Sequence, residues 1–359
     1  MQNQRLDKYL QQKYPSLSRA YIKEQIQLGN FLVYPAKSDK VGAKQFNRVY
    51  PEQGRGVGKK VKPSYLLQQE DAVALAPDFK LSETENKILP NPSIKLAIIY
   101  EDDDVLVIDK PAGLSVHPRQ DKNGLPLAEE LENTLVSGLL AYYPAIANVG
   151  DKSTSPFPSP TLGEGKTFSF SPSPLEGEGW GGVNLRPGIV HRLDKDTSGV
   201  MIVAKNQNSF DWLKKQFKER LVSKKYLALA CGHPKEKQGV IKTLLARAKN
   251  NPTKQKISTS EGKEAITEYQ VIKKFKDYSL IEARPKTGRL HQIRVHLAHL
   301  GHPVAGDAKY GDKRLSAPLG LARQFLHAKE LEIILPNQIK KNFIAPLPPD
   351  LENILQNIK

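Results

Sequence analysis

Apolar residues at helical spacing predict two short helices at the start of the chain. Each helix carries them on one face, first Leu6, Tyr9 and Leu10, then Tyr21, Ile22 and Ile26. Ser18 is placed to cap the second helix, and Gly29 is placed to end it. Continuous apolar runs then predict strands over Phe31–Tyr34 and Asp71–Leu75. These elements predict a small domain over residues 1–80.

A second and larger domain, residues 94–359, is predicted after the polar, proline-containing linker 81–93. Its apolar runs predict a hairpin and two further strands: Leu96–Tyr100 with Val105–Ile108, then Val200–Ala204 and Lys224–Ala230. Residues 135–143 have the pattern of a helix. Ser209 is the expected N-cap of another helix, whose apolar face carries Phe210, Leu213, Phe217 and Leu221.

Two segments interrupt these predicted domains. Residues 36–60 separate the strands of the first domain, and their cluster Gly54–Lys60 has the glycines of a phosphate loop without the Walker spacing. Residues 150–183 contain two near-copies rich in Pro, Gly and Ser, Pro158–Gly165 and Pro172–Gly179. Such composition cannot bury a core, so we expect a low-complexity insertion in a surface loop.

The charge of the chain points to a polyanionic partner. Lys and Arg outnumber Asp and Glu by 54 to 38, a formal net charge of +16. The sequence shows no apolar signal segment after Met1 and no run long enough to span a membrane. A single cysteine, Cys231, excludes an internal disulfide. We therefore expect a reduced, cytoplasmic, nucleic-acid-binding protein with no membrane partner.

The densest group of polar residues is Arg186–Gly199, which lies between two short apolar runs. His191, Arg192, Asp194 and Lys195 follow one another closely there, and the strand Val200–Ala204 begins directly afterwards. A carboxylate at the edge of a core must be paired or used in chemistry. By itself, this stretch is equally compatible with a polar turn that holds one structural ion pair.

The stretch His191–Gly199 resembles the signature His-Arg-Leu-Asp-x-x-Thr-Ser-Gly of the RluA/RluD family of RNA pseudouridine synthases. The resemblance implies that Asp194 is the catalytic residue. Three later segments are similar to further motifs of this family, Lys224-x-Tyr226, Gly288–His296 and Phe325–Ala328. They imply an active-site tyrosine at Tyr226, an arginine that pairs with the catalytic acid at Arg294, and an apolar pocket residue at Leu326.

The first domain resembles an S4 RNA-binding domain in four short segments: Arg5–Leu10, Ser18-Arg19, Ile26–Asn30 and Lys62–Tyr65. The resemblance implies that Arg5, Arg19, Lys23 and Lys62 contact RNA. The family resemblance implies an α+β fold, in which the S4 module precedes a catalytic domain with a central, mostly antiparallel mixed sheet.

The implied chemistry suits these residues. A buried aspartate tends to take up a proton, and a guanidinium in contact with it opposes that tendency and matches the carboxylate in shape. Asp194 can then attack C6 of uracil or C1′ of ribose, or promote loss of the 2′ hydrogen, and the sequence leaves these routes open. Tyr226 is a candidate general acid or base, or only a strand aromatic facing the core.

A uridine inside a stem must be flipped out before it can reach a buried carboxylate. The resemblance makes Arg192 the candidate for occupying the vacated space, and His191 and Lys195 are further candidates for contact with the substrate. The basic helix face 214–220 is a candidate for phosphate contact, although such charges are as often only solvated.

No metal or cofactor is expected. Four histidines, His291, His296, His299 and His302, are spaced by five, three and three residues and lack the i, i+4 pair of zinc enzymes. The acidic turn Glu101–Asp104 has the composition of a solvated turn. Isomerisation of uridine requires neither redox chemistry nor a phosphate donor.

The sequence therefore predicts an RNA pseudouridine synthase that acts as a monomer on structured ribosomal RNA or the pre-ribosomal large subunit. The segment Tyr142–Asn148 favours the RluD-like branch and 23S rRNA. One alternative is an RluC-like synthase for other 23S uridines, and a second is an RNA-binding ribosome-assembly factor with dispensable catalysis. A small-molecule glycosidase would need a second carboxylate near Asp194 and would leave the net charge without a role.

Overall fold

The computed structural model describes most of the chain in eleven stretches: residues 4–14, 19–34, 58–68, 71–77, 79, 88–119, 126–127, 130–151, 186–248, 251–311 and 320–359. The predicted cap Ser18, the greater part of both predicted insertions and residues 81–87 of the predicted linker lie outside this set. Within the described residues, no helix is both long enough and apolar enough to cross a membrane.

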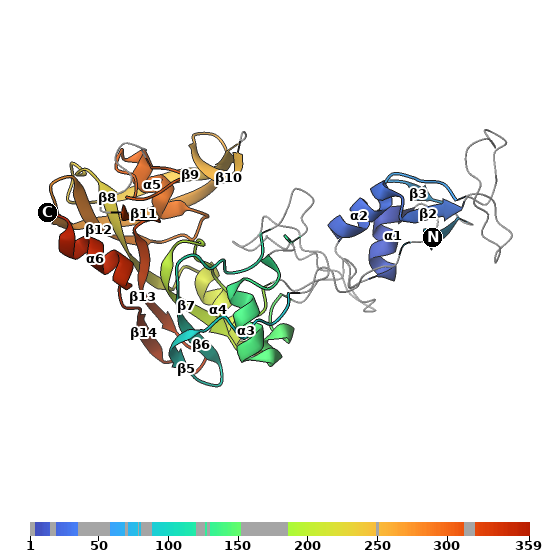
Figure 1. Ribbon diagram of the computed structural model, residues 1–359, viewed down its shortest axis with the longest axis horizontal. Coiled ribbons are helices and arrows are strands. Elements are labelled where there is room, and N and C mark those ends of the chain that lie inside the picture. Colours follow the sequence, from blue (N-terminus) through green and yellow to red (C-terminus); the bar gives the residue numbers. More distant parts are fainter. Residues whose placement is uncertain are drawn as a thin grey trace, which may run out of the picture.

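The first 80 residues contain a small unit, shown in blue in Figure 1. It has two helices, α1 (Leu6–Lys13) and α2 (Arg19–Leu28), and four short strands: β1 (Gln4–Arg5), β2 (Phe31–Tyr34), β3 (Leu66–Leu67) and β4 (Ala72–Leu75). Strands β1 and β3 pair with each other, as do β2 and β4, all antiparallel. The predicted apolar faces form the core, which includes Leu6, Leu10, Ile22 and Ile26. Gly29 ends α2 with a φ of 83°, a conformation that favours glycine.

The rest of the chain forms one large mixed sheet, as predicted. Its strands are β5 (Ala97–Glu101), β6 (Val105–Lys110), β7 (Ser198–Ala204), β8 (Ser223–Cys231), β9 (Gln238–Ala248), β10 (Asn251–Ser258), β11 (Lys263–Lys274), β12 (Tyr278–Pro285), β13 (Leu326–Ile334) and β14 (Lys340–Ile344). They are ordered β10-β9-β11-β12-β8-β13-β7-β6-β5, and β14 pairs with β13. Every pairing is antiparallel except that of β13 with β7.

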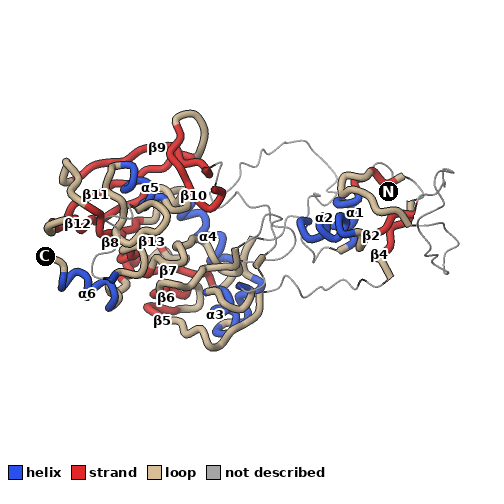
Figure 2. The backbone as a smooth tube through the Cα atoms, turned by 45° about the horizontal axis from the view of Figure 1, so that its top comes forward, coloured by secondary structure: helices blue, strands red, loops and turns tan. Residues whose placement is uncertain are grey.

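Helices cover this sheet in two groups, which Figures 1 and 2 show from different sides. Helix α3 (Leu135–Tyr142), the 3-10 helix η2 (Pro144–Asn148) and α4 (Gln207–Lys218) pack beside β6 and β7. Helices α5 (Gln292–His299) and α6 (Pro349–Asn357) pack with β8 and β12. The described part of the sheet therefore carries two large hydrophobic cores and a smaller one around Leu245, and Tyr226 on β8 packs against both large cores.

Two details of the predicted elements are wrong. Helix α4 is capped by Asn206, whose side chain accepts the Ser209 N–H, so the helix begins before the predicted cap. Leu221 lies beyond the end of α4 and is 55% exposed, outside the apolar face. Residues before the predicted start of the large domain at 94 also pack with it, since Ile88 is buried in its core and the Leu89 N–H donates to the Leu131 carbonyl. Sequence periodicity could not reveal this last contact, because its two residues lie far apart in the chain.

The polar stretch 186–197 enters the sheet where β7 begins to pair with β13. Gly199 has a φ of 119°, and a side chain there would collide with the backbone of Ala328 on β13. His191 fixes the stretch to the core, because its Nε2 accepts the Ile202 N–H at 3.0 Å. Its ring also stacks on Phe217 of α4, with 4.6 Å between the ring centroids. A neutral imidazole is required for this arrangement, since a protonated ring cannot accept a hydrogen bond.

This contact predicts that stability depends on pH through His191. Burial, with a smaller effect from the charge of Lys224, lowers its pKa to about 3. The unfolded chain, with a histidine pKa of about 6.5, takes up the proton first, so the free energy of unfolding falls as pH drops from about 6.5 towards 3. We expect a loss of about 2 kcal/mol between pH 7 and pH 5 from this one group. Urea unfolding at both pH values should show a smaller pH effect for His191→Gln than for the wild type.

The exposed His299 provides the control for this measurement. His299→Gln should keep the wild-type difference between the two pH values. Equal pH effects in His191→Gln and the wild type would show that His191 is not held neutral by its contacts.

Candidate active site

Asp194 lies on a tight turn that the surrounding backbone holds in place. The Thr197 N–H donates to the Asp194 carbonyl at 3.1 Å, and buried Leu193 anchors the turn from inside. The carbonyl of the next residue, Lys195, accepts the Gly113 N–H and the Lys110 ammonium, each at 3.0 Å. The Asp194 side chain is 16% exposed and lines a cavity. The turn therefore presents one carboxylate to the cavity while its backbone is fixed from below.

Arg294 of α5 joins this carboxylate to a second one. Its guanidinium donates through Nη1 to Asp194 at 2.8 Å, and through Nε and Nη2 to Asp307 at 2.7 and 2.8 Å. The side chains of Arg294 and Asp307 are 5% and 0% exposed. A bidentate pair fixes a guanidinium in one orientation, so Asp307 determines where Arg294 meets Asp194.

The electrostatics of this group follow from its contacts. Burial raises the pKa of Asp307, but the hydrogen bonds and charge of Arg294 outweigh it and hold that pKa below its ordinary value. Burial lowers the pKa of Arg294, yet Asp307 and Asp194 together raise it above its usual range. The guanidinium therefore stays charged, and it also lies 5.3 Å from the ring centroid of Tyr310.

Tyr226 and Leu326 line the same cavity from the adjacent strands β8 and β13. Burial, together with the negative charge of Asp194, raises the pKa of Tyr226. Its phenol is therefore neutral near pH 7 and can donate a proton or stack on a base. Leu326 is 4% exposed and adds apolar surface beside the acid. The predicted trio of Asp194, Tyr226 and Arg294 meets at one cavity, although 100 residues separate the two charged members.

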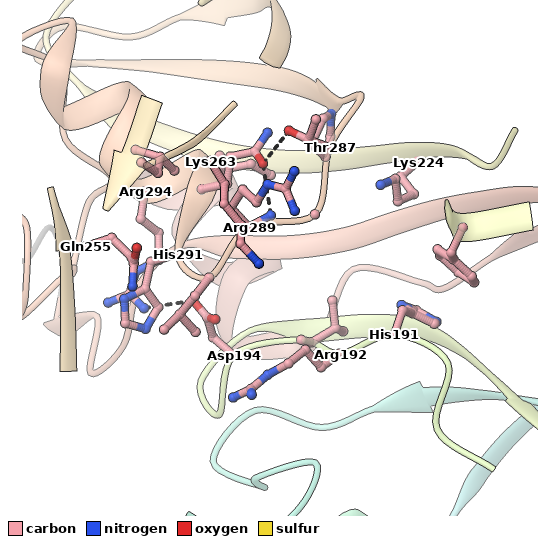
Figure 3. A pocket seen from close by; sticks show the side chains of 18 of the residues that line it. His191, Arg192, Asp194, Lys224, Gln255, Lys263, Thr287, Arg289, His291 and Arg294 are labelled. Atoms are coloured by element: carbon pink, nitrogen blue, oxygen red, sulfur yellow. Dashed lines mark hydrogen bonds and ion pairs between the residues drawn. The ribbon is translucent and has the colours of Figure 1, made fainter. Parts of the chain in front are cut away.

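The cavity has a volume of about 680 Å³, and Figure 3 shows the charged residues around it. Its lining contains Lys or Arg at eleven positions and carboxylates at only two, Asp194 and Glu261. Both the volume and the charge exceed what a single catalytic acid requires. The cavity therefore suits an extended anionic ligand.

The remaining residues predicted to contact the substrate differ in position. Arg192 is exposed and lines the cavity, and His191 lines it too, although its Nε2 and ring face are engaged by Ile202 and Phe217. The Lys195 side chain is exposed and is not among the residues that line the cavity. Contact of these three residues with substrate stays a prediction.

The predicted RNA-binding residues of the small unit also differ in exposure and in contacts. The Arg5 guanidinium donates to the buried Asp7 at 3.0 and 3.1 Å, so it is held against its own helix. Lys62 is exposed and Lys23 is half-buried. The side chain of Arg19 lies outside the described part of the structure.

Three of the four histidines between residues 291 and 302 have structural partners. His291 Nδ1 contacts the Tyr310 hydroxyl at 2.8 Å, and His302 Nδ1 contacts the Cys231 carbonyl at 2.9 Å. His296 lies between Thr243 and Thr267, at 3.0 and 2.9 Å. Among the described residues, no group of three or more His, Cys, Asp or Glu side chains is arranged to hold a metal ion.

Three residues of the site escaped the sequence analysis: Asp307, Lys110 and Gln292. Asp307 lies a few residues after the four histidines, and its acid character beside them was the available signal. Lys110 is fully buried, with an ammonium that donates to the carbonyls of Pro111, Leu114 and Lys195. Gln292 accepts from Thr287 and the Arg289 N–H and donates to Ile266 and Thr267. Polar side chains that hold backbone carry no periodic signal in a sequence.

Comparisons with known proteins agree on one family. The family model of RNA pseudouridylate synthase matches residues 178–299. An RNA pseudouridine synthase of Aquifex aeolicus is 36% identical over 321 residues, which cover 88% of this chain and 80% of that protein. The ribosomal large subunit pseudouridine synthase D of Borreliella burgdorferi is 32% identical over 329 residues, 92% of this chain and 87% of that protein.

A solved structure extends the likeness to the fold. The structure of human RNA pseudouridylate synthase domain containing 1 superposes with a TM-score of 0.50 at 27% identity, over 72% of this chain and 87% of that one. Identity above 30% across most of the length of two relatives establishes common descent. The chain therefore belongs to the RluA/RluD family of RNA pseudouridine synthases.

Proposed function

We propose that this RNA pseudouridine synthase modifies large-subunit (23S) ribosomal RNA, with Asp194 as the nucleophile that acts on a flipped-out uridine. The Borreliella burgdorferi relative is named a ribosomal large subunit pseudouridine synthase, which supports this choice of RNA. The single observation that carries the catalytic assignment is the 2.8 Å contact between Asp194 and Arg294 at the wall of a strongly cationic cavity.

The reaction is an isomerisation, so every atom of the uridine is retained. The N1–C1′ bond breaks, the base turns, a C5–C1′ bond forms, and the hydrogen at C5 leaves as a proton while N1 gains one. Asp194 supplies a carboxylate for a temporary covalent bond that keeps base or sugar in place during the turn. Arg294 orients that carboxylate and balances its charge.

Tyr226 can take part as a neutral phenol. Its raised pKa leaves the phenolate scarcely populated near pH 7, so it acts first as a proton donor or as a stacking surface. Leu326 packs beside it, which gives the base an apolar face to lie against. Arg192, which is exposed and lines the cavity, is proposed to fill the space that the flipped base leaves in the stem.

The small N-terminal unit is proposed to be an S4 RNA-binding module, with Lys62 as the exposed residue among the predicted contacts whose side chains are described. Its separate hydrophobic core supports its treatment as a domain in residues 1–80. We further propose that the enzyme acts as a cytoplasmic monomer on rRNA or the pre-ribosomal large subunit, since the substrate chemistry requires no second copy or membrane.

Replacement of the proposed nucleophile tests the function directly. Asp194→Asn keeps the shape of the side chain but removes its charge and nucleophilicity. We expect tritium release from C5-labelled 23S rRNA to fall by about three orders of magnitude or more. Undiminished release would reject the catalytic role of Asp194 and favour an assembly factor whose chemistry is dispensable.

Asp211 on α4 offers a control, because it is exposed and, among the described residues, accepts a side-chain hydrogen bond only from Gln207 of the same helix. Asp211→Asn removes one carboxylate and should retain wild-type tritium release. Absence of release from the wild-type protein itself would reject the proposed function.

The role of Asp307 is tested through the kinetic constants. Asp307→Asn removes half of the bidentate contact that orients Arg294, so Asp194 should be misplaced while the RNA-binding surface is unchanged. A displacement on the order of 1 Å can cost about 100-fold in rate, so we expect kcat to fall roughly 10- to 100-fold with KM nearly constant. Thermal unfolding should accompany the assay, so that rates refer to folded enzyme.

Asp307→Glu should recover part of the lost kcat, because it restores a carboxylate at a slightly different reach. A rise in KM with unchanged kcat in Asp307→Asn would contradict the positioning role.

The substrate is tested by mapping pseudouridines in rRNA from cells that lack this protein. One or more 23S positions should lose their pseudouridine and regain it when the wild-type chain, but not Asp194→Asn, is supplied. Loss confined to another RNA, with all 23S positions intact, would show that the substrate is different.

A further inference from the structure

One wall of the active-site cavity carries a cluster of four cations outside the catalytic trio: Arg220, Lys224, Lys286 and Arg289, here called the basic corner. They come from three separate segments, the turn after α4, strand β8 and the loop between β12 and α5. In Figure 3, Lys224 lies towards the other end of the cavity from Arg294, with Arg289 between them. Segments distant in sequence thus converge on one cationic region.

The neighbouring carboxylates neutralise only part of this charge. Glu264 accepts from Arg220 at 3.3 Å, and it also lies 3.5 Å from Lys242, while Glu268 lies 2.8 Å from Lys286. The side chain of Lys224 makes no hydrogen bond or ion pair with any other described residue, although its backbone pairs with β13. A half-buried ammonium without a counter-ion is costly, and an anion delivered by a ligand would remove that cost.

Strand geometry places this ammonium beside the catalytic residues. Lys224 and Tyr226 are two residues apart on β8, so their side chains share one face, about 7 Å apart along the strand. Both line the cavity. Lys225 points to the other face, where its ammonium lies 2.8 Å from Glu330.

Arg289 is held in advance of any ligand. Its N–H donates to Gln292 Oε1 at 3.0 Å, and its Nε donates to the Glu264 carbonyl at 3.0 Å, which leaves the terminal nitrogens of its guanidinium for other partners. Gln292 is buried and uses both ends of its amide in this loop. A preorganised cation loses little freedom on binding, which favours affinity.

Burial and the mutual repulsion of these cations both lower pKa values in the basic corner. Burial, followed by the charges of Arg220 and Lys286, lowers the pKa of Lys224 to about 8. Burial and Arg220 likewise lower the pKa of Arg289, although Glu264 opposes them. Both effects indicate that positive charge accumulates here without enough negative charge to balance it.

We propose that the basic corner binds a phosphodiester of the RNA strand, within a nucleotide or so of the uridine that is modified. A flipped nucleotide remains bonded to a phosphate on each side, so phosphate must enter the cavity together with the base that reaches Tyr226. The phosphate of the RNA backbone can therefore supply the negative charge that Lys224 lacks inside the cavity. This inference rests on the proposed function, because it takes RNA as the ligand.

Salt dependence of RNA binding tests the subsite. Lys224→Gln should weaken binding of 23S rRNA about tenfold at moderate salt and reduce the slope of log affinity against log salt by about 0.7–0.9, the loss of one phosphate contact. Lys225→Gln removes the same charge one residue away on the opposite face and should leave the slope close to wild type. Lys224→Arg, which keeps the charge, should retain the wild-type slope and shows that the position tolerates substitution.

A neutral linkage in the RNA identifies the ligand group. A synthetic stem-loop around the mapped uridine would carry a methylphosphonate at one linkage at a time. At one linkage, wild-type binding should weaken, whereas Lys224→Gln should bind the neutral and charged stem-loops equally. Equal losses in both proteins at every linkage, or equal salt slopes for Lys224→Gln and Lys225→Gln, would overturn the proposal. Because binding is measured apart from turnover, loss of tritium release in the wild type would reject the function without deciding the subsite.

Discussion

The active site depends on one guanidinium that serves two carboxylates. Asp307 takes Nε and Nη2 of Arg294, and this leaves Nη1 as the only nitrogen directed at Asp194. The interior half of the arrangement is nearly inaccessible to water, whereas Asp194 keeps some exposure to the cavity. Removal of Asp307 or Arg294 would leave the other as a buried, unpaired charge, so these two residues form the rigid part of the site. Asp194 is the carboxylate that remains free to react.

The backbone beneath Asp194 is likewise held rigidly, while the side chains above it stay free. Lys110 is fully buried, and its ammonium has three donors and three carbonyl acceptors, one of which belongs to the residue after Asp194. Arg323 binds the Asp196 carbonyl at 3.1 Å and contacts Asp350 of α6. The turn that carries Asp194 is therefore tied to β6 and to the C-terminal helix through carbonyl oxygens. Its side chains remain available to the cavity.

The sequence predicted many of the helices and strands because apolar periodicity leaves local signals, whereas the mostly antiparallel sheet followed from the resemblance to the family. The hairpin of β5 and β6 and the small core around Leu6 and Ile22 are examples. The pairing of Asp194 with Arg294 came from the resemblance to the family, since no local pattern links residues 100 apart. Asp307 and Lys110 were missed because their importance is a matter of burial and of contacts with distant backbone. The cap of α4 was misassigned to Ser209 for a local reason, because two good capping residues lie three positions apart and only the backbone path selects Asn206.

The cavity lies where the two large hydrophobic cores of the sheet meet. This position explains how one site can combine an apolar surface with a cationic one. Tyr226 packs against both cores, and Leu326 belongs to one of them, so the base is offered an apolar surface. Two residues back along β8, the same face reaches Lys224 and the cations around it. A nucleotide has the same polarity, with a flat apolar base and a charged backbone a few ångströms away. Because a strand repeats its facing every two residues, one strand orients both ends of the nucleotide, and a shift of register by one residue would lose both together.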